Sequence, residues 1–139
     1  MNYFLDTNTV VAILRNRPEV VRSRLRRAVA RGATVSISLV VLFELWYGVA
    51  RSSRLAENAE RVRAFLAGHV NVVPFEEEDG AVAAEIRVTL EKTGTVIGPY
   101  DLLIAAQALR HGVTLVTANV EEFSRVHNLS WKDWAADPS

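Results

Sequence analysis

Residues 34–50 read TVSISLVVLFELWYGVA, a β-branched segment that runs directly into a long apolar one. Residues Thr34 to Ile37 are predicted to form a strand, because β-branched side chains favour extended backbone. Ser38 then caps a helix that reaches about Ala50, since a serine hydroxyl can accept a hydrogen bond from a free amide of the first turn. A strand that passes directly into a helix is typical of βαβ units and therefore of a parallel sheet.

The rest of the chain repeats this alternation. Strands are predicted at residues 2–5, 71–73, 114–117 and 129–131, and helices at 18–31, 55–67, 76–93 and 100–110. Proline near the helix starts (Pro18, Pro99) and glycine just past the helix ends (Gly32, Gly68, Gly112) support these limits. We therefore predict one α/β domain over residues 1–139, with three layers (α/β/α) around a central parallel sheet of four to five strands.

The composition restricts the chemistry. The 139 residues include no cysteine, which excludes disulfides and thiolate zinc sites, and the three histidines have no ligand-like spacing. A bound metal would therefore be held by oxygen, as Mg²⁺ and Mn²⁺ prefer. The start lacks the pattern of a signal peptide, and the apolar stretch from Val35 to Ala50 is too short to span a bilayer. We expect a soluble, cytoplasmic protein that has no contact with membranes.

Three acids stand where an open parallel sheet collects its ligands, outside the carboxyl ends of the strands. Asp6 follows the first strand, Glu44 lies two turns into the helix after the second strand, and Asp101 opens the helix after Gly98. Each has a structural alternative: Asp6 as a helix cap, Asp101 as a complement to the helix dipole, and Glu44 in an arginine salt bridge.

Glu44 is the hardest of the three to explain by structure alone. Its segment is apolar on nearly all sides, as in a buried helix, and no basic residue lies three or four positions away. An ionised carboxylate is costly to bury without a partner. A cation shared with Asp6 and Asp101 is one solution, and such a site suits phosphodiester hydrolysis, where the metal lowers the pKa of a bound water.

A set of short motifs occurs in a fixed order along the chain. They are LDTN at 5–8, Ser38 with EL at 44–45 and YG at 47–48, GPYD at 98–101, IAA at 104–106, VTAN at 116–119, EFSRV at 122–126 and DW at 133–134. In this order the chain resembles the PIN-domain ribonucleases from about residue 3 to residue 134. Among them it is similar to the VapC toxins of type II toxin–antitoxin pairs.

The resemblance implies a PIN-like α/β/α fold and a metal-dependent endoribonuclease. Its members bind Mg²⁺ or Mn²⁺ through acids that match Asp6, Glu44 and Asp101, and several VapC toxins cleave transfer RNA. Thr7 and Thr117 match hydroxyls that orient the acids or contact the metal, and Asn8 belongs to the same motif as Asp6. The implied partners are RNA, a VapB-like antitoxin that inserts its C-terminal segment, and a second copy of the chain, in a homodimer and a toxin–antitoxin hetero-oligomer.

The chain departs from the family at Asn119, where many PIN domains carry a fourth acid. Glu121 and Glu122 are the candidates to supply the missing carboxylate. The departure leaves an alternative function open, a degenerate PIN module that binds RNA or protein without cleavage. A phosphatase of the haloacid-dehalogenase or receiver type ranks last, because it needs an acid two residues after the first and Asn8 stands there.

Basic residues are concentrated in the first half of the chain. Residues 1–70 hold 11 arginines against 5 acids, and residues 71–139 hold 11 acids against 5 basic residues. Arg24, Arg27 and Arg31 share one face of the helix predicted at 18–31. Together with Arg15 they are candidates to bind RNA phosphates, and a solvated helix face is the alternative.

Overall fold

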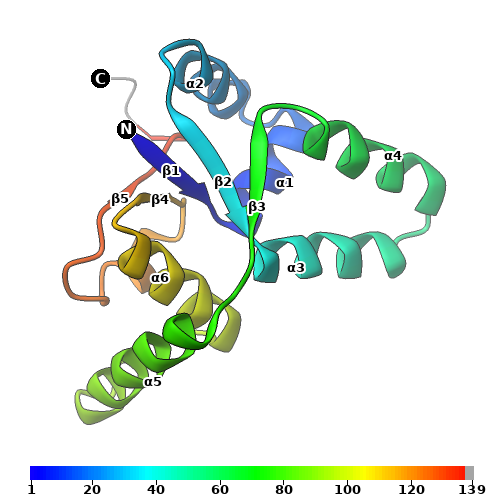
Figure 1. Ribbon diagram of the computed structural model, residues 1–139. Helices are drawn as coiled ribbons and strands as arrows, with labels where there is room; N and C mark the ends of the chain where they lie inside the picture. Colours follow the sequence, from blue (N-terminus) through cyan, green and yellow to red (C-terminus); the bar gives the residue numbers. More distant parts are fainter. Residues whose placement is uncertain (137–139) are drawn as a thin grey trace.

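The computed structural model describes residues 1–136, which form a five-stranded sheet with helices on both sides (Figure 1). The strands stand in the order β3 (Val70–Val73), β2 (Thr34–Ser38), β1 (Asn2–Leu5), β4 (Thr114–Val116) and β5 (Trp131–Lys132). Every pair of neighbours is parallel. The predicted α/β/α fold with a parallel sheet of four to five strands is confirmed.

Seven helices connect these strands within the described part of the chain. They are α1 (Thr7–Arg15), α2 (Glu19–Ala30), α3 (Leu39–Ala50), α4 (Leu55–Leu66), α5 (Glu77–Lys92), α6 (Pro99–His111) and α7 (Val120–Phe123). The chain first moves from β1 through β2 to β3, and then returns past β1 to β4. Because crossovers between parallel strands are right-handed, this reversal puts α5 and α6 on the face opposite α1 (Figure 1).

The core lies between the central strands and the helices on both faces. Leu5, Val35, Ile37 and Leu115 from the strands and Ile104 from α6 are almost fully buried. Strands covered on both faces carry nearly continuous apolar runs, which explains why the strand segments could be recognised in the sequence. None of the helices in residues 1–136 is long and apolar enough to cross a membrane.

The structure corrects three details of the sequence-based prediction. Helices α1 and α7 were not predicted, and β5 covers Trp131–Lys132 instead of residues 129–131. The interpretation of α3 as a helix buried on nearly all sides is wrong, because Leu39, Phe43 and Tyr47 are exposed along one side. A helix rich in apolar residues was taken for a buried one, although half of its circumference faces away from the sheet.

Candidate active site

The sheet has its topological switch point between β1 and β4. The connections that follow these two neighbouring strands leave toward opposite faces of the sheet, which opens a crevice at the strands' carboxyl ends. Asp6 directly follows β1 and Thr117 directly follows β4. The strand order therefore places these two side chains at the point where α/β proteins bind their ligands.

Asp6 is held rigidly at the end of β1. Its carboxylate is 3% exposed and accepts a hydrogen bond from the Thr9 amide at 2.9 Å, so it caps α1. Burial raises the pKa of Asp6, and hydrogen bonds from Thr117 and Thr9 oppose that rise. Capping and membership of an acid cluster are therefore compatible, because the capping bond uses one oxygen of the carboxylate.

Glu44 is half-buried on α3 and meets a hydroxyl from α1. The Thr7 hydroxyl donates a hydrogen bond of 2.6 Å to Glu44 Oε1. Within residues 1–136, no ion pair includes Glu44, so the arginine salt bridge considered above is absent there. Since Thr7 follows Asp6, this bond also brings the carboxylates of α1 and α3 to the same crevice.

Asp101 lies in the first turn of α6, among the other acids. Burial raises its pKa, and the negative charges of Glu122, Asp6 and Glu44 raise it further, to about 7. A carboxyl group acquires such a value where like charges crowd it and little cationic charge faces it. Asp6, Glu44, Asp101 and Glu122 therefore form one carboxylate cluster, which we call the acid cluster.

Glu122 occupies its place through two hydrogen bonds. The Gly98 amide donates to Oε1 at 2.6 Å, and the Asn119 side-chain amide donates to Oε2. The Gly98 bond is the main reason that the pKa of Glu122 lies below its usual range. A Cβ atom on Gly98 would lie 3.6 Å from both Asp101 Oδ2 and Glu122 Oε1, so the two carboxylates flank the same backbone segment.

The structure distinguishes the three residues that the sequence offered for the fourth position of the acid cluster. Glu122 faces Asp101, whereas Asn119 directs its amide nitrogen to Glu122. Glu121 has a side chain that is 90% exposed, and it lies 3.8 Å from Arg125. The structure thus brings Glu122 to the acid cluster. Asn119 holds Glu122 there by a hydrogen bond, and Glu121 stays at the surface.

The other predicted residues lie in different places. Thr117 is buried. Its hydroxyl bonds to Asp6 and accepts a hydrogen bond from the Asn119 backbone amide at 2.9 Å. Asn8 is exposed on the first turn of α1. Arg15 lines a groove of about 210 Å³ between α1, α3 and α4, which Glu44 also lines. Arg24, Arg27 and Arg31 line a separate cavity, so the four arginines do not form a single surface.

Sequence reasoning missed two groups that hold the cluster together. Thr9 donates its amide to Asp6 and its hydroxyl to the Val116 carbonyl at 3.0 Å, which ties α1 to the end of β4. Its position three residues after the capping Asp6 is a signal that could have identified it. The Gly98 amide carries no comparable sequence signal.

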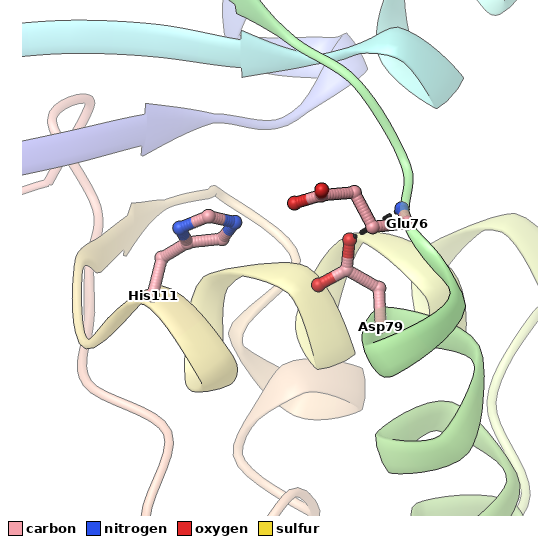
Figure 2. A group of neighbouring side chains, drawn as sticks. All are labelled: Glu76, Asp79 and His111. Atoms are coloured by element: carbon pink, nitrogen blue, oxygen red, sulfur yellow. Dashed lines mark hydrogen bonds between the residues drawn. The ribbon is translucent and has the colours of Figure 1, made fainter.

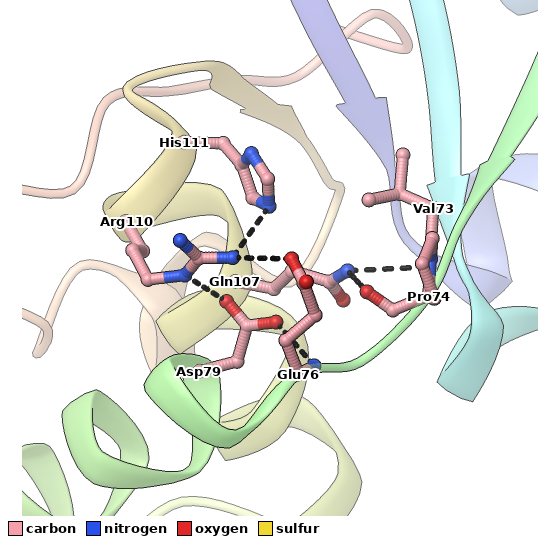
Figure 3. A network of polar contacts seen from close by, with 7 residues as sticks. All are labelled: Val73, Pro74, Glu76, Asp79, Gln107, Arg110 and His111. Carbon is pink, nitrogen blue, oxygen red and sulfur yellow. Dashed lines mark hydrogen bonds and ion pairs between the residues drawn. The ribbon is translucent and has the colours of Figure 1, made fainter.

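A second acidic group lies near the end of α6. Glu76, Asp79 and His111 each offer a ligand atom within 4.8 Å of the others, and within residues 1–136 they are the one trio that does so (Figure 2). Figure 3 shows, however, that the Arg110 guanidinium pairs with Asp79 and Glu76 and also contacts His111. Because a side-chain cation already neutralises these acids, we assign the trio to the fold.

This network fastens α5 to α6 and to β3. Asp79 is fully buried and also accepts the Glu76 amide at 2.7 Å, which closes the N-terminal cap of α5. Gln107 donates to the carbonyls of Val73 and Pro74 at 3.2 and 2.9 Å (Figure 3). The network lies outside the acid cluster and supports the helix that carries Asp101.

The fold and the acid cluster together define a class of protein. The family model for the PIN domain matches residues 3–129. The chain belongs to the PIN-domain family.

Within that family it groups with the VapC ribonucleases. It is 37% identical to ribonuclease VapC2 of Rickettsia felis over 134 residues, 96% of this chain and 98% of that one. The tRNA(fMet)-specific endonuclease VapC of Salmonella typhimurium is 33% identical over 134 residues, again 96% of this chain and 98% of that one. Among solved structures, promoter-DNA-bound VapBC2 of Rickettsia felis has a TM-score of 0.90 at 36% identity, covering 96% of this chain and 99% of that chain.

Proposed function

We propose that this protein is a divalent-metal-dependent endoribonuclease that acts as the toxin of a toxin–antitoxin pair. The observation that carries the proposal is the convergence of Asp6, Glu44, Asp101 and Glu122 at the switch point, where burial and then the charges of the neighbouring acids raise the pKa of Asp101 to about 7. Four carboxylate groups with such an excess of negative charge fit an oxygen-liganded divalent cation. Membership among the VapC ribonucleases supports the same activity.

In this proposal Asp6, Glu44 and Asp101 hold the metal, and Glu122 completes the acid cluster. Mg²⁺ or Mn²⁺, when bound, lowers the pKa of a water for attack on a phosphodiester and offsets the charge that builds on the phosphate. Thr7 orients the Glu44 carboxylate, and Thr117 and Thr9 fix that of Asp6. Asn119 and the Gly98 amide hold Glu122, so Asn119 takes part as a positioning residue and brings no charge.

The substrate and partners follow from the relatives. One relative is a tRNA(fMet)-specific endonuclease, which makes transfer RNA the first substrate to examine in a cytoplasmic setting. Similar solved structures are VapBC complexes, which supports a VapB-like antitoxin and a toxin–antitoxin hetero-oligomer. A toxin homodimer within it is part of this proposal. The groove between α1, α3 and α4 is the proposed seat of the antitoxin segment, because it is largely apolar and includes Glu44 at the acid cluster.

The proposal is tested by expressing the chain alone and with Asp6→Ala. The wild-type chain should arrest growth, and the purified protein should cleave RNA with Mg²⁺ or Mn²⁺ but not with EDTA. Asp6→Ala should abolish both effects, since it removes a buried member of the acid cluster. If Asp6→Ala leaves the arrest intact, the degenerate, non-cleaving PIN module becomes the better description.

Metal affinity should depend on pH near neutrality. A metal binds the deprotonated carboxylate, and the pKa of Asp101 is raised to about 7, so protons compete with the cation below that pH. Mn²⁺ affinity measured by calorimetry should rise by up to about tenfold per pH unit from pH 5.5 to 7 and then level off. Asp101→Asn should bind more weakly with a flatter profile, and an equal slope in both proteins would contradict this assignment.

A further inference from the structure

A second cavity, about 660 Å³ in volume, lies between α2 and the two ends of the described chain. One wall consists of Arg24 and Arg27 on α2 with Arg31 at its C-cap, and the other includes Lys132 on β5 and Trp134 after it. In Figure 1, α2 and the N-terminus lie at the same end of the molecule. We call this space the arginine cavity.

The arginine cavity is strongly basic. Of residues 1–136, three arginines, Lys132 and Met1 at the N-terminus line it, together with one acid, Asp133. Arg26, which belongs to the same helix, is exposed elsewhere on α2 and does not line the cavity. Three arginines of this segment therefore line the cavity, and Arg26 offers a matched position outside it.

The spacing of these arginines suits a polyanion. Arg24 and Arg31 are seven residues apart on one helix, a rise of about 10 Å. Each strand of a B-form DNA duplex carries one phosphate per about 3.4 Å of helix axis, so more than one backbone phosphate can lie within reach of this row. Guanidinium groups present paired donors that match phosphate oxygens, which makes a row of arginines better suited to this ligand than a row of lysines.

The arginine cavity borders the segment that supports the acid cluster. The Thr117 amide donates to the Lys132 carbonyl at 2.9 Å, and the Thr117 hydroxyl bonds to Asp6. Asp133 lines the cavity and is close enough to Asp6 for its charge to act on it. Trp134 packs edge-on against Tyr3 of β1 at 5.3 Å between ring centroids, so aromatic contacts fix this wall.

We propose that the arginine cavity binds backbone phosphates of the substrate RNA away from the cleavage site, near the amino ends of β1 and β2. This inference rests on the proposed ribonuclease function. Four carboxylates repel an RNA strand, so an enzyme with this site needs a basic surface elsewhere on the molecule to hold its substrate. An acidic peptide is the competing ligand, and RNA is favoured because three guanidinium groups, which match phosphate oxygens, line one cavity with Lys132.

The test measures binding of a fluorescein-labelled transfer RNA by anisotropy, with the full chain in EDTA so that no cleavage occurs. Arg27→Glu and Lys132→Glu change two different walls of the cavity, and each should raise the dissociation constant about tenfold or more. Each should also lower the slope of log K against log salt by about 0.7 to 1. Arg26→Glu is the matched control, because it makes the same charge change on the same helix outside the cavity.

The outcomes separate the possible explanations. Weakening confined to Arg27→Glu and Lys132→Glu supports the proposal, provided that both variants bind Mn²⁺ as the wild type does. Equal weakening in Arg26→Glu, or none in any variant, overturns it. A polyglutamate peptide that binds the wild type more tightly than transfer RNA does at equal charge, and that loses this affinity in Arg27→Glu, would favour an acidic protein ligand and would also overturn it.

The same assay distinguishes this inference from the proposed function. If the wild type binds RNA through the arginine cavity but cleaves none with Mn²⁺, the ribonuclease proposal fails and the phosphate-binding surface remains. If it cleaves RNA and the cavity variants bind normally, the ribonuclease proposal stands and the cavity has no part in holding the substrate.

Discussion

Replacement of Asp101 by asparagine is expected to lower kcat/KM for RNA cleavage about a hundredfold or more. Asp101 is the acid on which the charges of the other three members of the cluster act, so the cation that balances them should bind beside it. Asparagine keeps the shape of the side chain and removes its charge. The measurement is initial cleavage rates with saturating Mn²⁺ at pH 7.5.

The same substitution should stabilise the metal-free protein. Because the folded-state pKa of Asp101 is raised to about 7, its charged form is disfavoured by folding, and the group lowers stability as the pH rises from its usual pKa of 3.8 through 7. At pH 8 with EDTA, Asp101→Asn should therefore melt at a higher temperature than the wild type. If the Asp101 carboxylate stabilised the fold, the substitution would lower the melting temperature instead.

Glu121→Gln provides the control for Asp101→Asn. Glu121 is an exposed acid that directly precedes Glu122, and its pairing with Arg125 is loose. Its neutralisation should change both cleavage and melting temperature little, because exposed pairs contribute little. Loss of cleavage in Glu121→Gln, or normal cleavage in Asp101→Asn, would contradict the membership of the acid cluster given above.

Replacement of Arg110 by methionine is expected to lower the melting temperature by about 10 °C. Asp79 is fully buried, and Arg110 is the cation that pairs with it. Without Arg110 a buried carboxylate is left without its counter-charge. Loss of one partner destabilises a fold more than replacement of both partners by apolar residues. The measurement is thermal unfolding by circular dichroism at pH 7.

The pH dependence of this effect has a definite sign. Burial alone would raise the pKa of Asp79, but hydrogen bonding and charge from Arg110 hold it below its usual range. The stability from this pair is therefore present above pH 4 and is lost as the pH falls through the folded-state pKa. The difference between the wild type and Arg110→Met should shrink in the same range.

Arg87→Met is the matched control for this prediction. Arg87 forms an ion pair with Glu91 one turn away on α5, and both side chains are more than half exposed. Its loss should shift the melting temperature by less than about 2 °C. A similar shift in the two variants would mean that Arg110 acts only as a surface residue.

Much of the fold could be predicted from the sequence because its signals are local. The β-branched run at 34–37, the capping Ser38 and the apolar runs of the buried strands depend on residues close to one another in the chain. Helix α1 was not predicted, although Asp6 was recognised as a possible helix cap, because the Thr9 amide that completes the cap was overlooked. Burial of α3 was overestimated because apolar composition does not tell which side of a helix will be covered.

Three of the four members of the acid cluster could be predicted by the same reasoning. Asp6, Glu44 and Asp101 could be selected because each acid stands at the end of a strand or within an apolar helix. The fourth position could not be selected, since which of Asn119, Glu121 and Glu122 reaches the cluster depends on the direction of their side chains. That direction depends on the Gly98 amide, which lies 24 residues away from Glu122 in the chain.

The stretch from Thr34 to Ala50 illustrates the division. By itself the sequence determined a strand, a cap, a helix and an acid without a local partner, because these depend on propensity and on neighbours within about one turn. Only the tertiary structure decided that Glu44 bonds to Thr7, that Glu122 joins the acid cluster and that the arginines of α2 face Lys132. Such contacts join segments distant in sequence, and the order of the strands decides which segments meet.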